Sequence, residues 1–232
     1  MNFIFDLYGT LIDIKTDEQD RAPWNVACEF LGEDKESWQK VRREYLALCR
    51  ERIISKEHEI QLLDVFRELL TSRGKDANDA GELAWQFRCA STHKIRLFDG
   101  VREMLCALRQ AGAGVYLLSN AQSCFTLPEL DELDLLPLFD GVIISSDAGV
   151  KKPSKKIFDI ALDRFSLCTK DCIYVGNDMR DDILGATGAG LKTVYIHTEQ
   201  SGTYSELDIP APTHTASDHD HLKRILLDIA NK

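Results

Sequence analysis

The 232-residue sequence predicts an α/β fold in which a parallel, doubly wound sheet carries an all-helical insert. Beyond residue 94, short apolar runs alternate with amphipathic segments, which is typical of a sheet built from strand–helix–strand units. Between residues 16 and 93, apolar residues recur at a spacing of three to four without a strand pattern, which predicts helices only. The hydrophobic fraction of 44% and the net charge of -10 agree with a globular protein.

The first strand is predicted at residues 2–5, an apolar run that ends at Asp6 and precedes the turn-forming Gly9. A short apolar run bounded by a turn suits a strand that is buried on both faces of a parallel sheet. Four helices are expected in the insert, and glycines at two helix ends act as stop signals. The helices lie within residues 24–32, 36–54, 58–74 and 77–91, with Gly32 and Gly74 as the stops.

Strand and helix alternate through the rest of the chain. Helices are predicted at residues 101–112, 128–136, 155–165 and 182–190, strands at 114–120, 141–146, 172–178 and 192–197, then a loop over 200–217 and a last helix over 219–232. We therefore expect an α/β core from residues 1–15 and 94–232 and a helical cap from residues 16–93. Ligands of parallel sheets bind at the carboxyl ends of the strands, so the cap should lie over the site as a lid.

Composition and patterning exclude several classes of partner. A net charge of -10 repels phosphate backbones and anionic lipids, so neither a nucleic acid nor a membrane surface is an expected partner. The amino terminus lacks a basic leader, and no stretch of about 18 apolar residues occurs. The seven cysteines form an odd set without a CxxC pair and are expected to be reduced thiols. These features predict a cytoplasmic protein and leave its oligomeric state open.

Polar side chains follow several predicted strands at points where an apolar strand would not need them. They are Asp6, Ser119, Lys152, and the group Asn177, Asp178 and Asp182. Each alone has an ordinary structural explanation, such as capping a turn or facing solvent. Because the carboxyl ends of parallel strands meet at one edge of a sheet, their joint occurrence predicts a single site.

These residue types suit phosphoryl transfer to a carboxylate nucleophile. Asp6 would attack phosphorus and form an aspartyl-phosphate. Asp178 and Asp182 offer hard oxygen ligands for Mg²⁺, which lets a carboxylate approach an anionic phosphate. Lys152 would bind the phosphoryl oxygens as charge shifts in the transition state. The same substrate-binding role is expected of Thr10, Ser119 and Asn120.

Four motifs in register with the predicted strands resemble those of the haloacid-dehalogenase-like hydrolase superfamily. They are DLYGTL at 6–11, LLSN at 117–120, KKPSKKIF at 151–158 and VGNDMRDDILGA at 175–186. Their order and spacing match over essentially the whole chain, and the insert after the first motif resembles the helical cap of the family's first subclass. The resemblance implies a Rossmann-like core, a nucleophilic Asp6, and a Mg²⁺ ion that Asp6 and the backbone carbonyl of residue 8 help to bind.

Tyr8 departs from the family's phosphatases, which carry at this place an Asp that acts as general acid and base. Such a group contributes about 10² to 10⁴ in rate. A Tyr here resembles the 2-haloacid dehalogenases, whose halide leaves without a proton. Its phenol can donate a proton at neutral pH but accepts one poorly. Tyr8 is therefore a candidate catalytic residue as well as a carbonyl ligand of Mg²⁺.

The fourth motif favours the phosphatase instead. The resemblance implies a Ser and an Asn here in metal-independent dehalogenases, whereas this chain keeps Asp178, Asp181 and Asp182 and has Asn177 in place of the usual first acid. Without a cation, three carboxylates near Asp6 would raise one another's pKa values and repel anionic substrates. We expect Asp178 to be the first choice of Mg²⁺ ligand, with Asn177 as a replacement through its carbonyl oxygen. Asp182 is expected to bind the ion directly or to support a ligand, and Asp181 to face solvent.

The sequence thus predicts a Mg²⁺-dependent phosphatase that acts on a small phosphorylated metabolite through an aspartyl-phosphate on Asp6. Two alternatives remain open: a 2-haloacid dehalogenase that uses the same nucleophile, and a slow phosphate-binding regulatory protein that lost turnover with the general acid. The identity of the substrate depends on cap residues whose pattern carries no recognisable signal.

Overall fold

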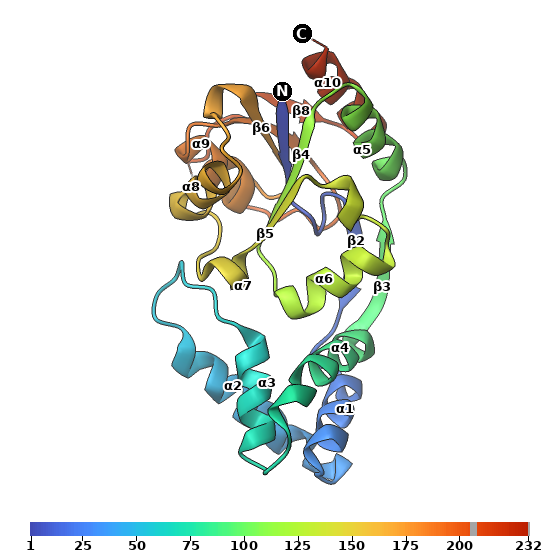
Figure 1. Cartoon of the computed structure of the whole chain (residues 1–232), viewed down its shortest axis with the longest axis vertical. Helices are drawn as coiled ribbons and strands as arrows, with labels where there is room; N and C mark the ends of the chain where they lie inside the picture. Colours follow the sequence, from blue (N-terminus) through green and yellow to red (C-terminus); the bar gives the residue numbers. More distant parts are fainter. Residues whose placement is uncertain (205–207, 232) are drawn as a thin grey trace.

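The computed structural model describes residues 1–204 and 208–231, and these form an α/β core with a helical cap below it (Figure 1). Within the described residues a six-stranded sheet runs in the order β5-β4-β1-β6-β7-β8 with every neighbouring pair parallel. The strands are β1 (Asn2–Phe5), β4 (Gly114–Ser119), β5 (Gly141–Ile144), β6 (Cys172–Gly176), β7 (Lys192–Ile196) and β8 (His214–Ala216). The predicted parallel sheet is confirmed.

Strand β1 lies at the centre of the sheet because both of its faces are apolar. Phe3 and Phe5 point to one face and Ile4 to the other, and all three are at most 1% exposed. Helices α5 (Val101–Gln110) and α10 (His219–Ala230) cover the Phe face, while α8 (Lys155–Arg164) and α9 (Gly185–Gly188) cover the Ile face (Figure 1). Burying one such side chain contributes about 1.5–3 kcal/mol, so the first strand is held firmly where it delivers Asp6.

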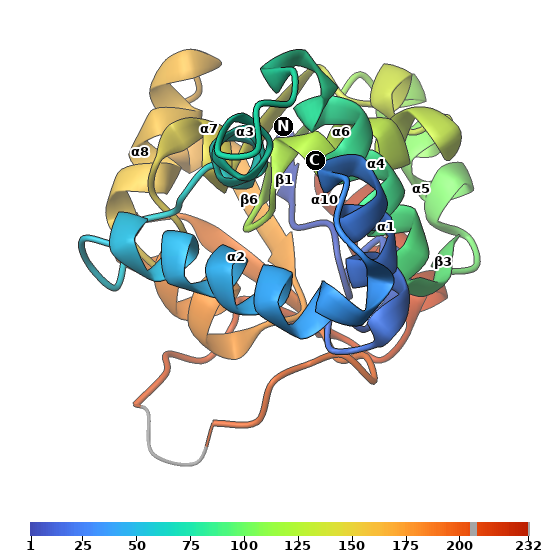
Figure 2. The same ribbon diagram turned by 90° about the horizontal axis from the view of Figure 1, so that it is seen from below.

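Four helices make up the cap, as predicted (Figure 2). They are α1 (Arg21–Leu31), α2 (Trp38–Arg52), α3 (Leu62–Thr71) and α4 (Ala80–Ser91). Their shared core is aromatic: the Trp24 ring meets Tyr45 and Phe87 edge-on at centroid distances of 5.2 and 4.8 Å. Gly32 ends α1 with φ 69°, a left-handed conformation that favours glycine over residues with a side chain.

A two-stranded antiparallel ribbon joins cap and core. It consists of β2 (Ile12–Thr16) and β3 (Thr92–Leu97), and it spans both of the expected domain boundaries. The sequence analysis predicted no strand between residues 16 and 93, and this is wrong where the ribbon enters the cap. Each strand is short and partly charged, and its partner lies about 80 residues away, so local periodicity carries little signal for the pair.

Other local differences concern short or irregular elements. Strand β8 lies inside the predicted 200–217 loop, and the helix predicted to start at residue 128 begins earlier as α6 (Ser123–Glu132). The predicted helix 182–190 begins in the structure as the end of a π-helical segment, η5 (Met179–Leu184), and continues as the α-helix α9. The last helix ends at Ala230, and Lys232 lies outside the described residues. The remaining elements are α7 (Ser145–Ala148) and the 3-10 turns η1 (Lys35–Ser37), η2 (Ala77–Asp79), η3 (Leu136–Leu138) and η4 (Thr169–Asp171).

Helix α6 of the core packs into the cap. Its Phe125 joins the aromatic cluster of the cap, with a ring centroid 6.5 Å from that of Phe66.

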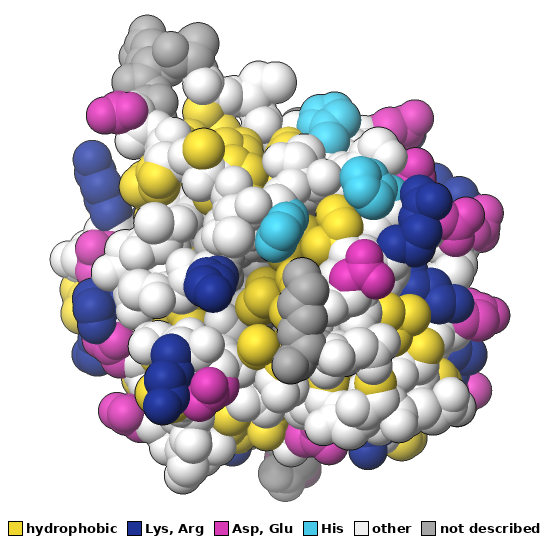
Figure 3. All heavy atoms as spheres, turned by 90° about the horizontal axis from the view of Figure 1, so that it is seen from above, with side chains coloured by type: hydrophobic (Ala, Val, Ile, Leu, Met, Phe, Trp, Pro, Cys, Tyr) yellow, Lys and Arg dark blue, Asp and Glu magenta, His cyan; other side chains and the backbone are white. Residues whose placement is uncertain are grey.

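On the face of the core that lies away from the cap, basic and acidic side chains are interspersed, and no broad basic area is visible in Figure 3. No helix in the described part of the chain has the length and apolar character needed to cross a membrane.

Candidate active site

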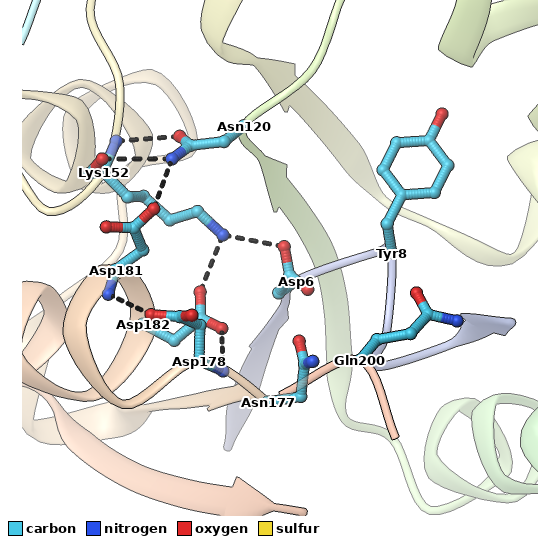
Figure 4. Close-up of a pocket in the computed structure, with 9 residues that line it drawn as sticks. All are labelled: Asp6, Tyr8, Asn120, Lys152, Asn177, Asp178, Asp181, Asp182 and Gln200. Carbon is cyan, nitrogen blue, oxygen red and sulfur yellow. Dashed lines mark hydrogen bonds and ion pairs between the residues drawn. The ribbon is translucent and has the colours of Figure 1, made fainter. Parts of the chain in front are cut away.

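The polar residues predicted at the strand ends come together at one edge of the sheet (Figure 4). They surround a cavity of about 160 Å³. It is lined by Asp6, Tyr8, Asn120, Lys152, Asn177, Asp178, Asp181, Asp182 and Gln200. Of the predicted site residues, Thr10 and Ser119 do not line the cavity, although the Thr10 hydroxyl donates a hydrogen bond to Asp6 Oδ2. The loops after β1, β4, β6 and β7 and the segment that follows α7 therefore converge here.

Asp6 follows β1 directly and is 7% exposed. Its backbone N–H donates to the Val175 carbonyl at 2.9 Å, which continues the β1–β6 ladder by one residue. The hydroxyl of Thr10 lies 2.8 Å from Asp6 Oδ2 and 3.1 Å from Asn177 Oδ1. Gly9, the residue before Thr10, has φ 83°, and a Cβ atom at this position would lie 2.4 Å from Asn177 Nδ2. Glycine is thus required both for the backbone turn and for the close approach of Asn177.

Lys152 is the buried cation of the site, at 3% exposed. Its ammonium group donates to Asp6 Oδ1 at 2.7 Å, to Asp182 Oδ1 at 2.7 Å and to the Tyr174 hydroxyl at 2.9 Å. Burial lowers its pKa, but the Asp182 and Asp6 carboxylates outweigh burial and hold the pKa well above its usual value. Lys152 therefore stays charged and orients the Asp6 carboxylate.

The π-helical segment η5 arranges the acids of the fourth motif. Asp178 caps it by accepting hydrogen bonds from the Arg180 and Asp181 amides at 2.9 and 2.7 Å. Asp182 is 1% exposed, and it accepts from the Asp178 amide at 2.9 Å as well as from Lys152. Burial is the largest influence on the Asp182 carboxyl and raises its pKa to about 7, although Lys152 lowers it.

Asp181 was expected to face solvent, and its side chain is 31% exposed in the structure. It lines the cavity, its Oδ2 accepts a hydrogen bond from Asn120 at 3.2 Å, and its buried Oδ1 has no hydrogen-bond partner in the structure. Burial and the neighbouring Asp178 raise the pKa of its carboxyl. Asp181 lies within the π-helical η5, whose turn is wider than that of an α-helix.

Asn120 joins two of the loops that form the site. Its amide nitrogen donates to the Lys152 carbonyl at 3.0 Å, and its amide oxygen accepts from the Lys152 backbone N–H at 2.8 Å. The paired bonds fix the backbone of Lys152 relative to the loop after β4. Ser119 is 1% exposed, and its hydroxyl has no partner within hydrogen-bonding distance.

The side chain of Tyr8 is turned away from Asp6 (Figure 4). Its hydroxyl bonds to the buried carboxylate of Glu129 and lies 2.9 Å from Thr126 Oγ1. Burial first, and then the charge of Glu129, raise the pKa of this phenol far above 10. Glu129 in turn pairs with Arg88 of the cap at 2.6 Å, so Tyr8 belongs to a buried polar link between core and cap.

Several residues of the site carry no signal in the sequence. Glu129 and Arg88 lie on helices of different domains, so no local pattern relates them to Tyr8. Gln200 lines the cavity from the loop after β7, and the hydroxyl of Tyr204 donates to Asp178 Oδ2 at 2.7 Å. Both residues fall in a stretch whose composition predicts only a loop.

The donor set of the cavity fits a divalent cation. Among the described residues no three His, Cys, Asp or Glu side chains converge as a complete metal site, so an ion here would also need backbone, amide or water oxygens. Four carboxylates line the cavity against the ammonium of Lys152, and one of their buried oxygens, Asp181 Oδ1, accepts no hydrogen bond in the described part of the structure and lies 3.8 Å from the Arg180 guanidinium. Hard oxygen donors with excess negative charge are the environment that Mg²⁺ prefers. If Mg²⁺ binds here, the Asp6 and Asp178 carboxylates, the Tyr8 carbonyl and the Asn177 amide oxygen would hold it, with Asp182 as a direct ligand or as support for one.

Comparison with known proteins gives a family match and several distant relatives. A family model of haloacid dehalogenase-like hydrolases matches residues 1–190. A ribulose-1,5-bisphosphate 5-phosphatase from Halopiger xanaduensis is 28% identical over 147 residues, which are 63% of this chain and 60% of that protein. The chain spans less than two thirds of the length of this and the other phosphatases that it matches first.

Two solved structures share the fold over nearly the whole chain. A 2-haloacid dehalogenase from Pseudomonas syringae superimposes with a TM-score of 0.68 at 23% identity and covers 99% of both chains. The HAD-hydrolase YfnB from Bacillus subtilis, bound to magnesium, gives a TM-score of 0.59 at 22% identity and covers 97% of this chain and 98% of that one. At sequence identities this low, the structural similarity shows that the fold is shared and nothing further.

Proposed function

Because the chain belongs to the haloacid dehalogenase-like hydrolase family, we propose that it is a Mg²⁺-dependent phosphatase of a small phosphorylated metabolite that works through an aspartyl-phosphate on Asp6. The observation that carries this proposal is the cavity itself, in which Lys152 orients Asp6 and the acids of the fourth motif face it. A volume of about 160 Å³ has room for a phosphoryl group and a few further atoms, so the substrate is small or extends toward the cap.

The chemistry follows from the contacts of Asp6. One carboxylate oxygen forms a bond to phosphorus while the bond from phosphorus to the leaving oxygen breaks, and that oxygen keeps the electron pair. Lys152 and Thr10 each hold one oxygen of Asp6, which limits the directions from which the carboxylate can attack. Water then hydrolyses the aspartyl-phosphate, which releases inorganic phosphate and restores Asp6. A bound Mg²⁺ would neutralise the charge between carboxylate and phosphate.

The dehalogenase alternative rests on Tyr8, but the charge of the cavity does not favour a dehalogenase. A 2-haloacid carries its own carboxylate, and within the described residues Lys152, already paired with two acids, is the cation that lines the cavity. The regulatory alternative draws support from the orientation of Tyr8, whose hydroxyl bonds to Glu129 instead of facing Asp6. A panel of phosphorylated metabolites and 2-haloacids, assayed with and without Mg²⁺, distinguishes the three functions. Turnover of haloacids alone, or phosphate binding without turnover, would replace the phosphatase proposal.

Millimolar Mg²⁺ should raise the melting temperature, and Asp178→Ala should remove this effect. A ligand that binds only the folded state at a hundredfold excess over its Kd stabilises by about 2.7 kcal/mol. For a chain of this size that corresponds to roughly 5–10 °C. Thermal scans with MgCl₂ and with a chelator measure the shift, and Asp131→Ala, an exposed acid outside the cavity, serves as the control. An unchanged Mg²⁺ response in Asp178→Ala would exclude Asp178 as a principal ligand.

The rate should depend steeply on the leaving group, and Tyr8→Phe should not alter that dependence. Nitrophenolate departs without a proton, whereas an alkyl alkoxide needs one, and the Tyr8 hydroxyl that could supply it bonds to Glu129 instead. A series of aryl and alkyl phosphates assayed on wild type and Tyr8→Phe measures the two slopes. If Tyr8→Phe selectively slows alkyl phosphates by about tenfold or more, the phenol acts as an acid during turnover.

A further inference from the structure

The cap contacts the core at a second place besides the β2–β3 ribbon. Residues 57–62, called here the cap segment, comprise the end of the connection between α2 and α3 and the first residue of α3, and they reach toward α7 (Figure 1). Within this segment His58 forms an antiparallel bridge with Val150. Next to the bridge, the Lys151 N–H donates to the carbonyl oxygen of Glu57 at 3.0 Å. The cap is therefore hydrogen-bonded to the residue that directly precedes Lys152.

Glu57 also contacts the chain on the C-terminal side of Lys152. The Ser154 hydroxyl donates to the Glu57 carboxylate at 2.8 Å. One cap residue thus bonds with its backbone to the residue before Lys152 and with its side chain to the second residue after it. Lys152, whose ammonium orients Asp6, lies between these two anchored positions.

The same cap segment is hydrogen-bonded to the loop that follows β4. The side-chain oxygen of Gln122 accepts from the Leu62 backbone N–H at 2.8 Å, and its amide nitrogen donates to the Ile60 carbonyl at 2.9 Å. Leu62 is the first residue of α3, so Gln122 satisfies an N–H that the helix itself leaves free. Gln122 comes two residues after Asn120, whose amide is bonded to the Lys152 backbone.

These contacts form one connected set. The cap segment bonds to two loops of the core, one carrying Asn120 and one carrying Lys152, and the two loops bond to each other through those same residues. We propose that Glu57 and Gln122 are positioning residues through which the seating of the cap sets the backbone that presents Lys152 to the phosphoryl group. This inference rests on the proposed phosphatase function for its kinetic consequence but not for its structural one.

Hydrogen–deuterium exchange of the ligand-free protein tests the structural consequence. In Glu57→Ala the amides of residues 149–152 and of Ser154 should exchange about fivefold faster, since one lost hydrogen bond of about 1 kcal/mol lowers the local opening free energy. Glu57→Gln keeps an oxygen that accepts from Ser154 and should restore slow exchange. Glu51→Ala, an exposed acid on α2, is the control with the same change of charge and should leave these amides unaffected.

Kinetics with phenyl phosphate test the catalytic consequence. Glu57→Ala and Gln122→Ala should each lower kcat several-fold and change KM less, because a displaced Lys152 weakens transition-state binding most. Glu57→Gln should restore kcat. Unchanged exchange in both alanine variants, or faster exchange with wild-type kcat, would overturn the positioning role. A wild type without phosphatase activity would instead contradict the proposed function, while the exchange result would still decide whether the cap holds the loop.

Discussion

Replacing Asp6 by Asn should abolish phosphate-ester hydrolysis, with a fall in kcat of at least about 10⁴-fold, because the amide keeps the shape of the side chain but lacks a nucleophilic charge. The Asn oxygen can still accept from Lys152, so the fold should be retained. Steady-state kinetics on a phosphorylated substrate measure the loss, and circular dichroism checks the fold. Asp13→Asn is a matched control: Asp13 is also a buried acid, but it lies on β2, pairs with Lys94 and Arg96 and does not line the cavity.

Beryllofluoride provides a second readout of the same prediction. This anion mimics a phosphoryl group bound to a carboxylate, so it should raise the melting temperature of the wild type and of Asp13→Asn but not of Asp6→Asn. If Asp6→Asn kept a tenth of wild-type activity, Asp6 would not be the nucleophile. An equal thermal shift in all three proteins would place the anion elsewhere.

The largest effect on stability is expected from Arg88→Ala. Arg88 of the cap and Glu129 of the core are 11% and 2% exposed in their side chains, and the guanidinium also lies over the rings of Tyr8 and Phe125 at 5.8 and 5.3 Å. Removing one member of a buried ion pair leaves the other charge uncompensated, which destabilises by about 3–5 kcal/mol. Urea denaturation should show a loss of this size.

Matched variants separate this loss from the general effect of removing an arginine. Arg67 pairs with Asp64 on the surface, with side chains 50% and 56% exposed, and Arg67→Ala should cost at most about 1 kcal/mol. Replacing both Arg88 and Glu129 by apolar residues should recover most of the stability, because no buried charge is then left unpaired. A loss below about 1 kcal/mol in Arg88→Ala would mean that the cap is not anchored through this pair.

The fold was predictable because its signals are local. The apolar run of β1, the alternation after residue 94 and the helical spacing of the cap each lie within a few residues of sequence. Elements defined by distant partners gave no such signal: β2 and β3 pair across the entire cap, and β8 needs β7 as its template. Residues 182–184 of the π-helical η5 were predicted as the start of an ordinary helix, since the pattern of residues does not report the width of the turn.

The sequence by itself determined which chemistry the chain can support. Asp6 and the acids after β6 follow buried strands, and parallel strands bring their carboxyl ends to one edge whatever the details of packing. Lys152 reaches the same edge from the segment after α7. Only the tertiary structure decided how these groups are used, because hydrogen bonds and burial depend on neighbours that are far apart in the chain. It turned Tyr8 toward Glu129 and Arg88, directed Asp181 into the cavity, and placed the cap segment against the loops of Asn120 and Lys152. The motif therefore predicts the reactive residues, and contacts between cap and core determine the surroundings in which they lie.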